Sequence, residues 1–237
     1  MRIGYLRTGF PPVALQGVFG DYLGMFRAML EPVLPGVVFE VFEVQRGHLP
    51  AGVGVCDAWL ACGSDNSVYD DEPWLPPLMG FIREVHAAGK PYLGICFGHQ
   101  LLAQALGGRV ERAGCGLRLG VRSVHLQRRA DWMQPFQQTV RLHHSHQDQV
   151  VVLPPGGEIL ASGEQCPCAM LAVGDHSLGV QGHPEFARDY MEAIIPAHTG
   201  RQPGSPVLLA RESLAQGVDN ELVAGWLGRF LLSSASV

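Results

Sequence analysis

The stretch that decides the fold runs from Pro91 to Gly108 and reads P-Y-L-G-I-C-F-G-H-Q-L-L-A-Q-A-L-G-G. It opens with a short apolar run, ending at Ile95, that is typical of a buried strand. From Phe97 onward the apolar side chains recur at the spacing of one helix face, and Gly107 and Gly108 end that helix. The sequence therefore predicts a strand that turns abruptly into a helix, with a cysteine at the turn.

Cys96 stands at this junction between Gly94 and Gly98, in a G-x-C-x-G turn. This is the arrangement of a nucleophile elbow, in which glycines let the backbone turn tightly and hold a nucleophile at the start of a helix. The N-terminus of the helix brings N–H groups and a positive partial charge to the sulfur, a setting in which thiols react. The alternative is that Cys96 is a small buried apolar residue, as most free cysteines are. The flanking glycines favour the nucleophile.

The composition of the 237 residues narrows the classes of protein to consider. An apolar fraction of 47% is enough for a large core, and a net charge of −5 without a basic block argues against a nucleic-acid partner. The sequence shows no signal peptide and no apolar run of membrane-spanning length, so we expect a cytoplasmic protein without a membrane partner. The six cysteines are irregularly spaced, which favours reduced thiols over a disulfide framework.

Strands and helices are predicted to alternate along the first half of the chain. Apolar and β-branched runs predict strands at residues 2–6, 37–44 and 57–62, helices at 22–30 and 74–88, and a Gly/Pro-rich loop at 8–20. Asp21 is placed to cap the first of these helices. After Gly108 the segments become shorter and are separated by turns, which indicates a small antiparallel sheet. The sequence thus predicts a flavodoxin-like, doubly wound α/β fold whose mostly parallel central sheet is flanked by helices.

The candidate base is His183, which lies in Q-G-H-P-E-F at the end of a predicted strand, with Glu185 two positions later. Residues two apart in an extended segment face the same way, so the carboxylate can hold the second nitrogen of the imidazole. A surface turn is the alternative for H-P-E alone. Together with Cys96 upstream, the pattern predicts a Cys/His/Glu triad.

This chemistry also needs hydrogen-bond donors for the oxyanion that forms on the substrate. One is expected to be the backbone amide of Phe97, directly after the nucleophile. The other is expected from the loop after the third strand, at Gly63 or Ser64, because the carboxyl ends of neighbouring parallel strands lie together. An ordinary strand-to-helix turn at that loop would fit the sequence as well.

Other histidines offer weaker alternatives. His99 lies inside the elbow helix, where its side chain is expected to point away from the sulfur. His143, His144 and His146 form a dense cluster that suggests metal binding, but extended spacing divides them between two faces. With no nearby Cys or Glu to complete a metal site, the sequence predicts neither a metal nor a cofactor.

Three motifs follow one another along the chain: G-I-C-F-G-H-Q-L-L-A-Q-A-L-G-G, H-S-H-Q-D-Q-V and Q-G-H-P-E-F. In this order they resemble those of class I glutamine amidotransferases, a likeness that covers about residues 40–195. The resemblance implies the fold of that family in a single domain over residues 1–237, with a core at about 40–195 and a helical tail at 205–237.

The same resemblance implies a reaction and its catalytic residues. Cys96 would attack the γ-amide of glutamine or of another γ-glutamyl compound, ammonia or an amine would leave, and water would hydrolyse the glutamyl thioester. His183 would act as the base and later as the acid, and Glu185 would orient its imidazole.

The resemblance also implies which residues hold the substrate. Gln100 matches a glutamine-binding position, and the backbone around Gln147 and Asp148 matches the loop that holds the α-amino and carboxylate groups. The C-G-S-D segment at residues 62–65 departs from the S-G-G-P that is usual in the family. Gly63 and Ser64 therefore both stay open as oxyanion donors.

The sequence leaves several functions to be distinguished. One is a glutaminase that supplies ammonia to a separate synthetase subunit, and a close alternative is a γ-glutamyl peptidase acting on peptides or conjugates. A regulatory or binding module without turnover is a further alternative, which the presence of all three triad residue types argues against. Another thiol enzyme of the same architecture is the last, but such enzymes place a histidine directly after the cysteine, where this chain has Phe97.

Overall fold

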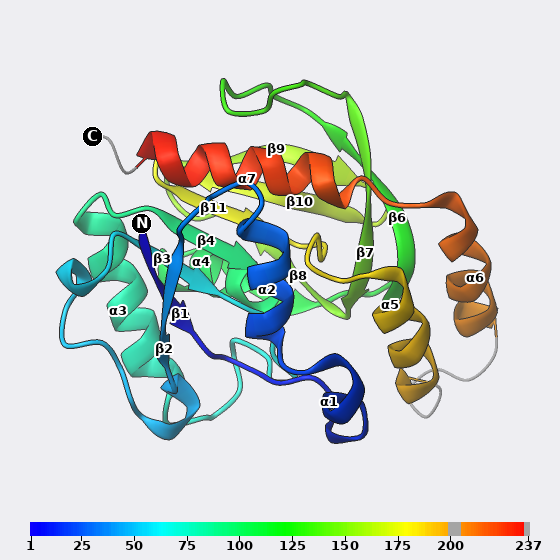
Figure 1. Cartoon of the computed structure of the whole chain (residues 1–237), viewed down its shortest axis with the longest axis horizontal. Coiled ribbons are helices and arrows are strands. Elements are labelled where there is room, and N and C mark those ends of the chain that lie inside the picture. The colour runs from blue at the N-terminus through cyan, green and yellow to red at the C-terminus, as the bar shows by residue number, and fades with distance from the viewer. Residues whose placement is uncertain (199–204, 235–237) are drawn as a thin grey trace.

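The computed structural model describes residues 1–198 and 205–234, and within them the chain builds one large twisted sheet covered by helices (Figure 1). From edge to edge the nine strands of this sheet are β2 (Val38–Phe42), β1 (Arg2–Leu6), β3 (Ala58–Ala61), β4 (Tyr92–Ile95), β11 (Ser177–Val180), β10 (Cys166–Val173), β9 (Gly157–Gly163), β6 (Arg118–Leu126) and β7 (Thr139–His146). A separate two-stranded sheet pairs β5 (Arg109–Arg112) with β8 (Asp148–Val152).

The strands from β2 to β11 run parallel, and those from β11 to β7 pair antiparallel. Every residue of β3, β4 and β11 is buried, as expected for parallel strands covered on both faces. The predicted flavodoxin-like α/β fold with a parallel centre and helices on its faces is confirmed. The predicted small antiparallel sheet is present as the pair of β5 and β8, and the antiparallel strands β10, β9, β6 and β7 extend the central sheet.

Two helices pack on each face of the parallel strands (Figure 1). On one face lie α3 (Leu75–Ala87) and α4 (Phe97–Ala105), and on the other lie α2 (Tyr22–Leu30) and α7 (Asn220–Ser234). The alternation of side chains along β3 feeds both layers, because Trp59 packs with α3 and α4 while Leu60 packs with α2 and α7. The sheet therefore separates two apolar cores.

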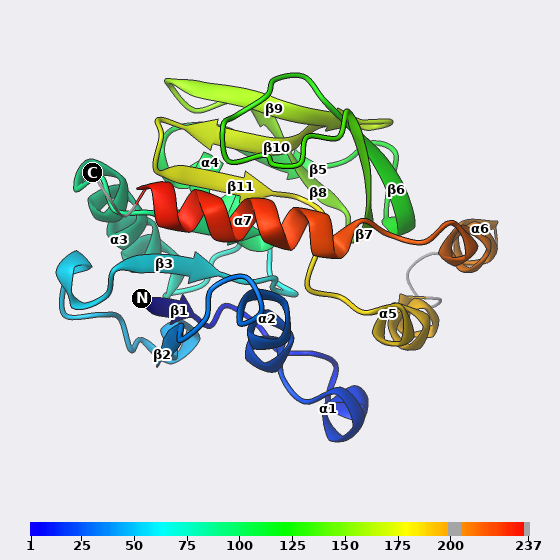
Figure 2. The ribbon, with the colours of Figure 1, turned by 45° about the horizontal axis from the view of Figure 1, so that its top comes forward.

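The remaining helices are α1 (Val13–Phe19), α5 (Arg188–Ile194) and α6 (Ser205–Ser213), with short 3-10 turns η1 (Val44–Arg46), η2 (Val53–Val55), η3 (Ile195–His198) and η4 (Leu214–Gln216). Figure 2 shows α1, α5 and α6 beyond one end of the sheet. In the described part of the chain, none of the helices combines the length and the apolar character needed to cross a bilayer. The predicted tail at 205–237 contains α6, η4 and α7, and its residues 235–237 lie outside the described part.

The prediction of a loop at residues 8–20 is wrong over part of its length, because α1 forms there without burying any side chain. Pro12 lies directly before this helix, and Gly20, with φ 69°, ends it. The prolines and glycines that suggest a loop are thus the boundaries of a short helix. The predicted cap of α2 is present, since the N–H of Gly24 donates to the Asp21 carboxylate at 2.9 Å.

Helix α4 begins in direct backbone contact with the strands beneath it, and two glycines make this possible. A Cβ atom at Gly98 would come within 2.3 Å of the carbonyl oxygen of Ala61, and one at Gly94 would come equally close to the carbonyl group of Gly98. The N–H of Gly98 donates to the carbonyl of Cys62 at 3.2 Å. The turn into α4 therefore depends on the absence of side chains at both positions.

We expect Gly98→Ala to destabilise the protein, because the added methyl group meets backbone atoms of β3 that cannot rotate away. Overpacking of this kind costs about 1–3 kcal/mol, and in a chain of this size each kcal/mol lowers Tm by about 2–4 °C. The matched control is Gly17→Ala in α1, where a Cβ atom meets nothing within 4 Å. Thermal denaturation followed by circular dichroism compares the two, and equal Tm values would contradict the close contact.

Candidate active site

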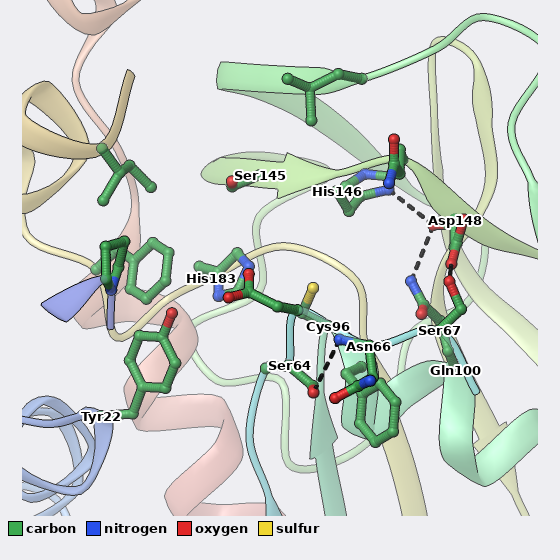
Figure 3. Close-up of a pocket in the computed structure, with 18 of the residues that line it drawn as sticks. Tyr22, Ser64, Asn66, Ser67, Cys96, Gln100, Ser145, His146, Asp148 and His183 are labelled. Carbon is green, nitrogen blue, oxygen red and sulfur yellow. Dashed lines mark hydrogen bonds between the residues drawn. The ribbon is translucent and has the colours of Figure 1, made fainter. Parts of the chain in front are cut away.

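A cavity of about 270 Å³ opens where β3, β4 and β11 end (Figure 3). Gly63 follows β3, Cys96 follows β4, and His183 lies in the segment after β11, and all three line the cavity. The expected meeting of these segments at the carboxyl ends of the parallel strands is thus present in the structure.

Cys96 is held in a backbone conformation that residues other than glycine rarely adopt, with φ 55° and ψ −102°. Within residues 1–198 and 205–234, Gln165 is the only other non-glycine residue with positive φ. The Cys96 N–H donates to the carbonyl of Val180 at 2.8 Å, and its own carbonyl accepts from the N–H of Gln100 at 3.1 Å. Strain of this kind costs about 1–3 kcal/mol and is concentrated at functional sites.

His183 and Glu185 form a buried pair at the same end of the sheet. Nδ1 of His183 lies 2.8 Å from Oε1 of Glu185, and only 4% and 1% of their side chains are exposed. The backbone N–H of His183 donates to the carbonyl of His143 at 2.8 Å, and its ring stacks on Phe186 with centroids 4.0 Å apart. In the described part of the chain Nε2 of His183 has no hydrogen-bond partner, so it is the ring nitrogen that is available for proton transfer with a ligand.

The charges around His183 favour its protonated form. Burial acts against the charge, but the carboxylate of Glu185 and the nearby sulfur of Cys96 outweigh it, and together they raise the pKa of His183 from 6.5 to about 10. The imidazole beside Cys96 is therefore an imidazolium ion at neutral pH. A cysteine beside an imidazolium is the usual environment of a thiol nucleophile.

The loop after β3 and the first turn of α4 place backbone groups around Cys96. Phe97 is the first residue of α4, and the first N–H groups of a helix have no acceptor within it. Gly63 lies against the imidazole, since a Cβ atom there would be 3.5 Å from Cε1 of His183. Ser64 also lines the cavity. The structure thus brings all three predicted oxyanion donors to the same cavity.

The far side of the cavity is polar and internally hydrogen-bonded (Figure 3). Nε2 of Gln100 donates to the carbonyl of Asp148 at 2.9 Å and to Gln181 at 3.1 Å. The Asp148 carboxylate accepts from the hydroxyls of Ser67 and Tyr69. Gln100 therefore supports the backbone at Asp148. The contacts of Ser67 and Tyr69 are absent from the sequence predictions because the two residues lie about 80 positions from Asp148.

The histidines of β7 form part of the packing beneath this polar side. Nδ1 of His144 lies 3.2 Å from His146, Nδ1 of His146 lies 3.0 Å from the carbonyl of Asp148, and Nδ1 of His143 lies 2.9 Å from that of Phe186. Burial lowers the pKa of each, that of His146 to about 3. These rings are neutral supports for the residues around the cavity. The described residues contain no cluster of three or more His, Cys, Asp or Glu side chains suited to a metal ion.

His99 lies apart from the cavity, as expected for its position in α4. Its side chain is fully buried, and burial lowers the pKa of its imidazole to about 4. It packs against the backbone of Gly179 in β11, where an added Cβ atom would be 2.5 Å from Nδ1. His99 therefore contributes to the contact between α4 and the sheet.

Comparison with known proteins gives a consistent set of relatives. A family model described as glutamine amidotransferase class-I matches residues 66–197. The chain is 31% identical over 190 residues to gamma-glutamyl peptidase 5 of Arabidopsis thaliana, covering 76% of this chain and 74% of that protein. It is 42% identical over 130 residues to a glutamine-hydrolysing GMP synthase of Synechocystis sp., covering 53% of this chain and 22% of the synthase.

A solved structure extends the likeness to the whole fold. A glutamine amidotransferase from Thermotoga maritima matches with a TM-score of 0.79 and covers 100% of this chain and 99% of its own. At 22% sequence identity, this match speaks for the fold alone.

The raised pKa of His183 makes a prediction about Glu185. We expect Glu185→Gln to lower this pKa markedly, because burial would then act against the charge with less compensation. The pKa of His183 in the folded protein lies above its value in the unfolded chain. The contribution of its proton to the free energy of unfolding is therefore fully present below about pH 6.5. It is lost as the pH rises through about 10. From pH 6 upward, the difference in unfolding free energy between the two proteins should therefore shrink.

NMR titration of the imidazole Hε1 signal and urea unfolding at several pH values measure the two effects. The matched control is Glu192→Gln, an exposed carboxylate that pairs with Arg188 at 2.9 Å on α5. It should leave the His183 titration unchanged. An unaltered His183 pKa in Glu185→Gln would show that the carboxylate is not the source of the shift.

Proposed function

Because the chain belongs to the class I glutamine amidotransferase family, we propose that Cys96, His183 and Glu185 carry out its hydrolysis of the γ-amide of glutamine or of another γ-glutamyl compound. One observation supports this assignment above the others. The Glu185 carboxylate holds Nδ1 of His183 at 2.8 Å, which leaves Nε2 beside the sulfur of a cysteine at a strained turn. A nucleophile, a base and an orienting group are thereby aligned.

In the first half of the reaction, the Cys96 thiolate attacks the γ-carbonyl carbon and a C–S bond forms. The negative charge that develops on the carbonyl oxygen is stabilised by the N–H of Phe97 and by that of Gly63 or Ser64. Nε2–H of His183 then protonates the amide nitrogen. The C–N bond breaks, ammonia or an amine leaves, and the glutamyl group remains on the sulfur as a thioester.

In the second half, water hydrolyses the thioester. Nε2 of His183 takes a proton from the water as its oxygen attacks the carbonyl carbon. A C–O bond forms and the C–S bond breaks, which releases glutamate and restores the pair of thiolate and imidazolium. Glu185 remains hydrogen-bonded to Nδ1 throughout and fixes the orientation of the ring.

We propose that the polar side of the cavity holds the amino-acid end of the substrate. The backbone around Gln147 and Asp148 lines this side, and Gln100 fixes the position of the Asp148 carbonyl. The Asp148 carboxylate supplies the negative charge that an α-ammonium group requires. In this arrangement the γ-carbonyl of the substrate points toward Cys96.

Different relatives support two uses of this reaction. The likeness to gamma-glutamyl peptidase 5 over 74% of that protein favours cleavage of γ-glutamyl compounds by the chain itself. The likeness to part of a GMP synthase favours a second candidate, in which ammonia passes to a separate synthetase subunit. We further propose that residues 1–237 act as a single domain, and the cytoplasmic location expected from the sequence stays a prediction.

Replacement of the nucleophile tests the mechanism. We expect Cys96→Ala to lower the release of ammonia from glutamine, or of amine from γ-glutamyl amides, by about 10⁴-fold or more, because no group replaces the sulfur. Wild-type protein that is mixed with substrate and then quenched in acid should show the added mass of one glutamyl group by intact-protein mass spectrometry. The variant should show none.

The matched control is Cys115→Ala, since the Cys115 thiol is exposed and does not line the cavity. It should retain full activity, and both variants should keep the wild-type Tm within a few degrees. Undiminished turnover by Cys96→Ala would remove this cysteine from the mechanism.

A further inference from the structure

The end of the cavity opposite Asp148 is apolar, and the mechanism above does not use it. Its rings are Tyr22 of α2, Phe186 of the segment before α5, and Tyr190 of α5, and we call these three residues the aromatic wall. Tyr22 stacks on Phe186 with centroids 5.9 Å apart, and Phe186 meets Tyr190 edge to face at 4.6 Å. Ile194 of α5 also lines the cavity and packs in the same apolar cluster as Phe186 and Tyr190. These residues provide a preformed apolar surface at the mouth of a catalytic cavity.

The aromatic wall begins at the proposed base. Phe186 stacks directly on the imidazole of His183, with centroids 4.0 Å apart and the two planes within 5°. In Figure 3, Tyr22 lies on one side of Cys96 and His183, and Asp148 and Gln100 lie on the other. The cavity thus has a polar end and an apolar end, with the sulfur and the imidazole between them.

The positions of the nucleophile and the proton donor indicate which part of the substrate lies at each end of the cavity. If the amino-acid end of the glutamyl group occupies the polar side, its γ-carbonyl carbon lies at Cys96. The leaving nitrogen must receive its proton from Nε2 of His183, so it lies on the histidine side of the carbonyl. Any substituent on that nitrogen then extends toward the aromatic wall.

The charges at this end of the cavity are unfavourable for an anion. None of the described residues that line the cavity is a lysine or an arginine, and Asp65 lies at its rim. Burial, with smaller contributions from the carboxylates of Glu185 and Asp65, raises the pKa of Tyr190 to about 12. Among the described residues that line the cavity, the cation is the His183 imidazolium, and the Glu185 carboxylate is already paired with it at 2.8 Å. A carboxylate on the leaving group would therefore meet Asp65 and find no unpaired cation among these residues.

We propose that the aromatic wall is the leaving-group subsite. It selects γ-glutamyl amides whose nitrogen carries an apolar, uncharged substituent over glutamine and over γ-glutamyl peptides. This inference rests on the proposed function, since it concerns the nitrogen side of the same scissile bond. An aryl or alkyl group on that nitrogen leaves water and packs against the rings of the aromatic wall. The leaving amine of a peptide carries a carboxylate into the same space.

Four substrates separate the effect of an apolar substituent on the leaving nitrogen from the effect of a carboxylate there. We expect kcat/KM for γ-glutamylphenethylamide to exceed that for γ-glutamylethylamide by about tenfold or more, because the phenyl ring reaches the wall. It should exceed that for γ-glutamylphenylalanine by a similar factor, and these two compounds differ only in the carboxylate. Glutamine, which has no substituent, should rank below the phenethylamide. Equal values for the phenethylamide and the ethylamide, or a preference for γ-glutamylphenylalanine, would overturn the proposal.

Variants of the wall give an independent readout. Tyr22→Ala should lower kcat/KM for the phenethylamide about tenfold and change that for the ethylamide little, whereas Tyr22→Phe should retain the preference. The matched control is Val18→Ala, an exposed position on α1 that does not line the cavity. Asp65→Asn should narrow the gap between γ-glutamylphenylalanine and the phenethylamide. An equal loss for all substrates in Tyr22→Ala, with an unchanged Tm, would contradict a leaving-group subsite.

The same panel separates this inference from the proposed function. Absence of turnover on all four substrates, or turnover that survives Cys96→Ala, would remove the proposed function itself. Turnover that depends on Cys96 but shows no preference for the apolar amine would leave the function standing and remove only the subsite.

Discussion

The contact between the first turn of α4 and the strands beneath it is the constraint on which the site depends. Because Gly94 and Gly98 have no side chains, the helix backbone rests directly on the backbone at the end of β3. The connection between strand and helix is then short enough to force Cys96 to φ 55°. The sulfur is thereby held at the meeting point of three strand ends, with the N-terminus of a helix beside it.

The second requirement is a charged pair kept out of water. His183 and Glu185 are almost completely buried, and an isolated charge in such a place would be unfavourable. Each charge is acceptable because the other is in hydrogen-bond contact with it. Neutral histidines of β7 surround the pair and add no competing charge, since burial lowers the pKa of His144 and His146. The imidazolium is therefore directed toward the sulfur.

Sequence patterns predicted those parts of the fold and the site that depend on near neighbours. The parallel strands, the cap at Asp21 and the helix after Cys96 follow from local apolar spacing and turn residues, and each is present. His183 and Glu185 lie two positions apart and their side chains meet as predicted, although Pro184 and Glu185 form a turn instead of an extended segment. Helix α1 was not predicted, since its seven residues lie between prolines and glycines that suggest a loop, and its Leu15 and Phe19 are only partly buried against α5.

What the sequence by itself determined is the chemistry of the site: a cysteine at a glycine turn, and an imidazole with its carboxylate. Only the tertiary structure decided the surroundings. The polar end depends on Ser67 and Asp148, which are 81 positions apart in the sequence. The aromatic wall brings together Tyr22 and Tyr190, which are 168 positions apart. The physical reason is that a pattern fixes the direction of side chains within one element. Which elements meet is decided by the packing of the two cores around the sheet.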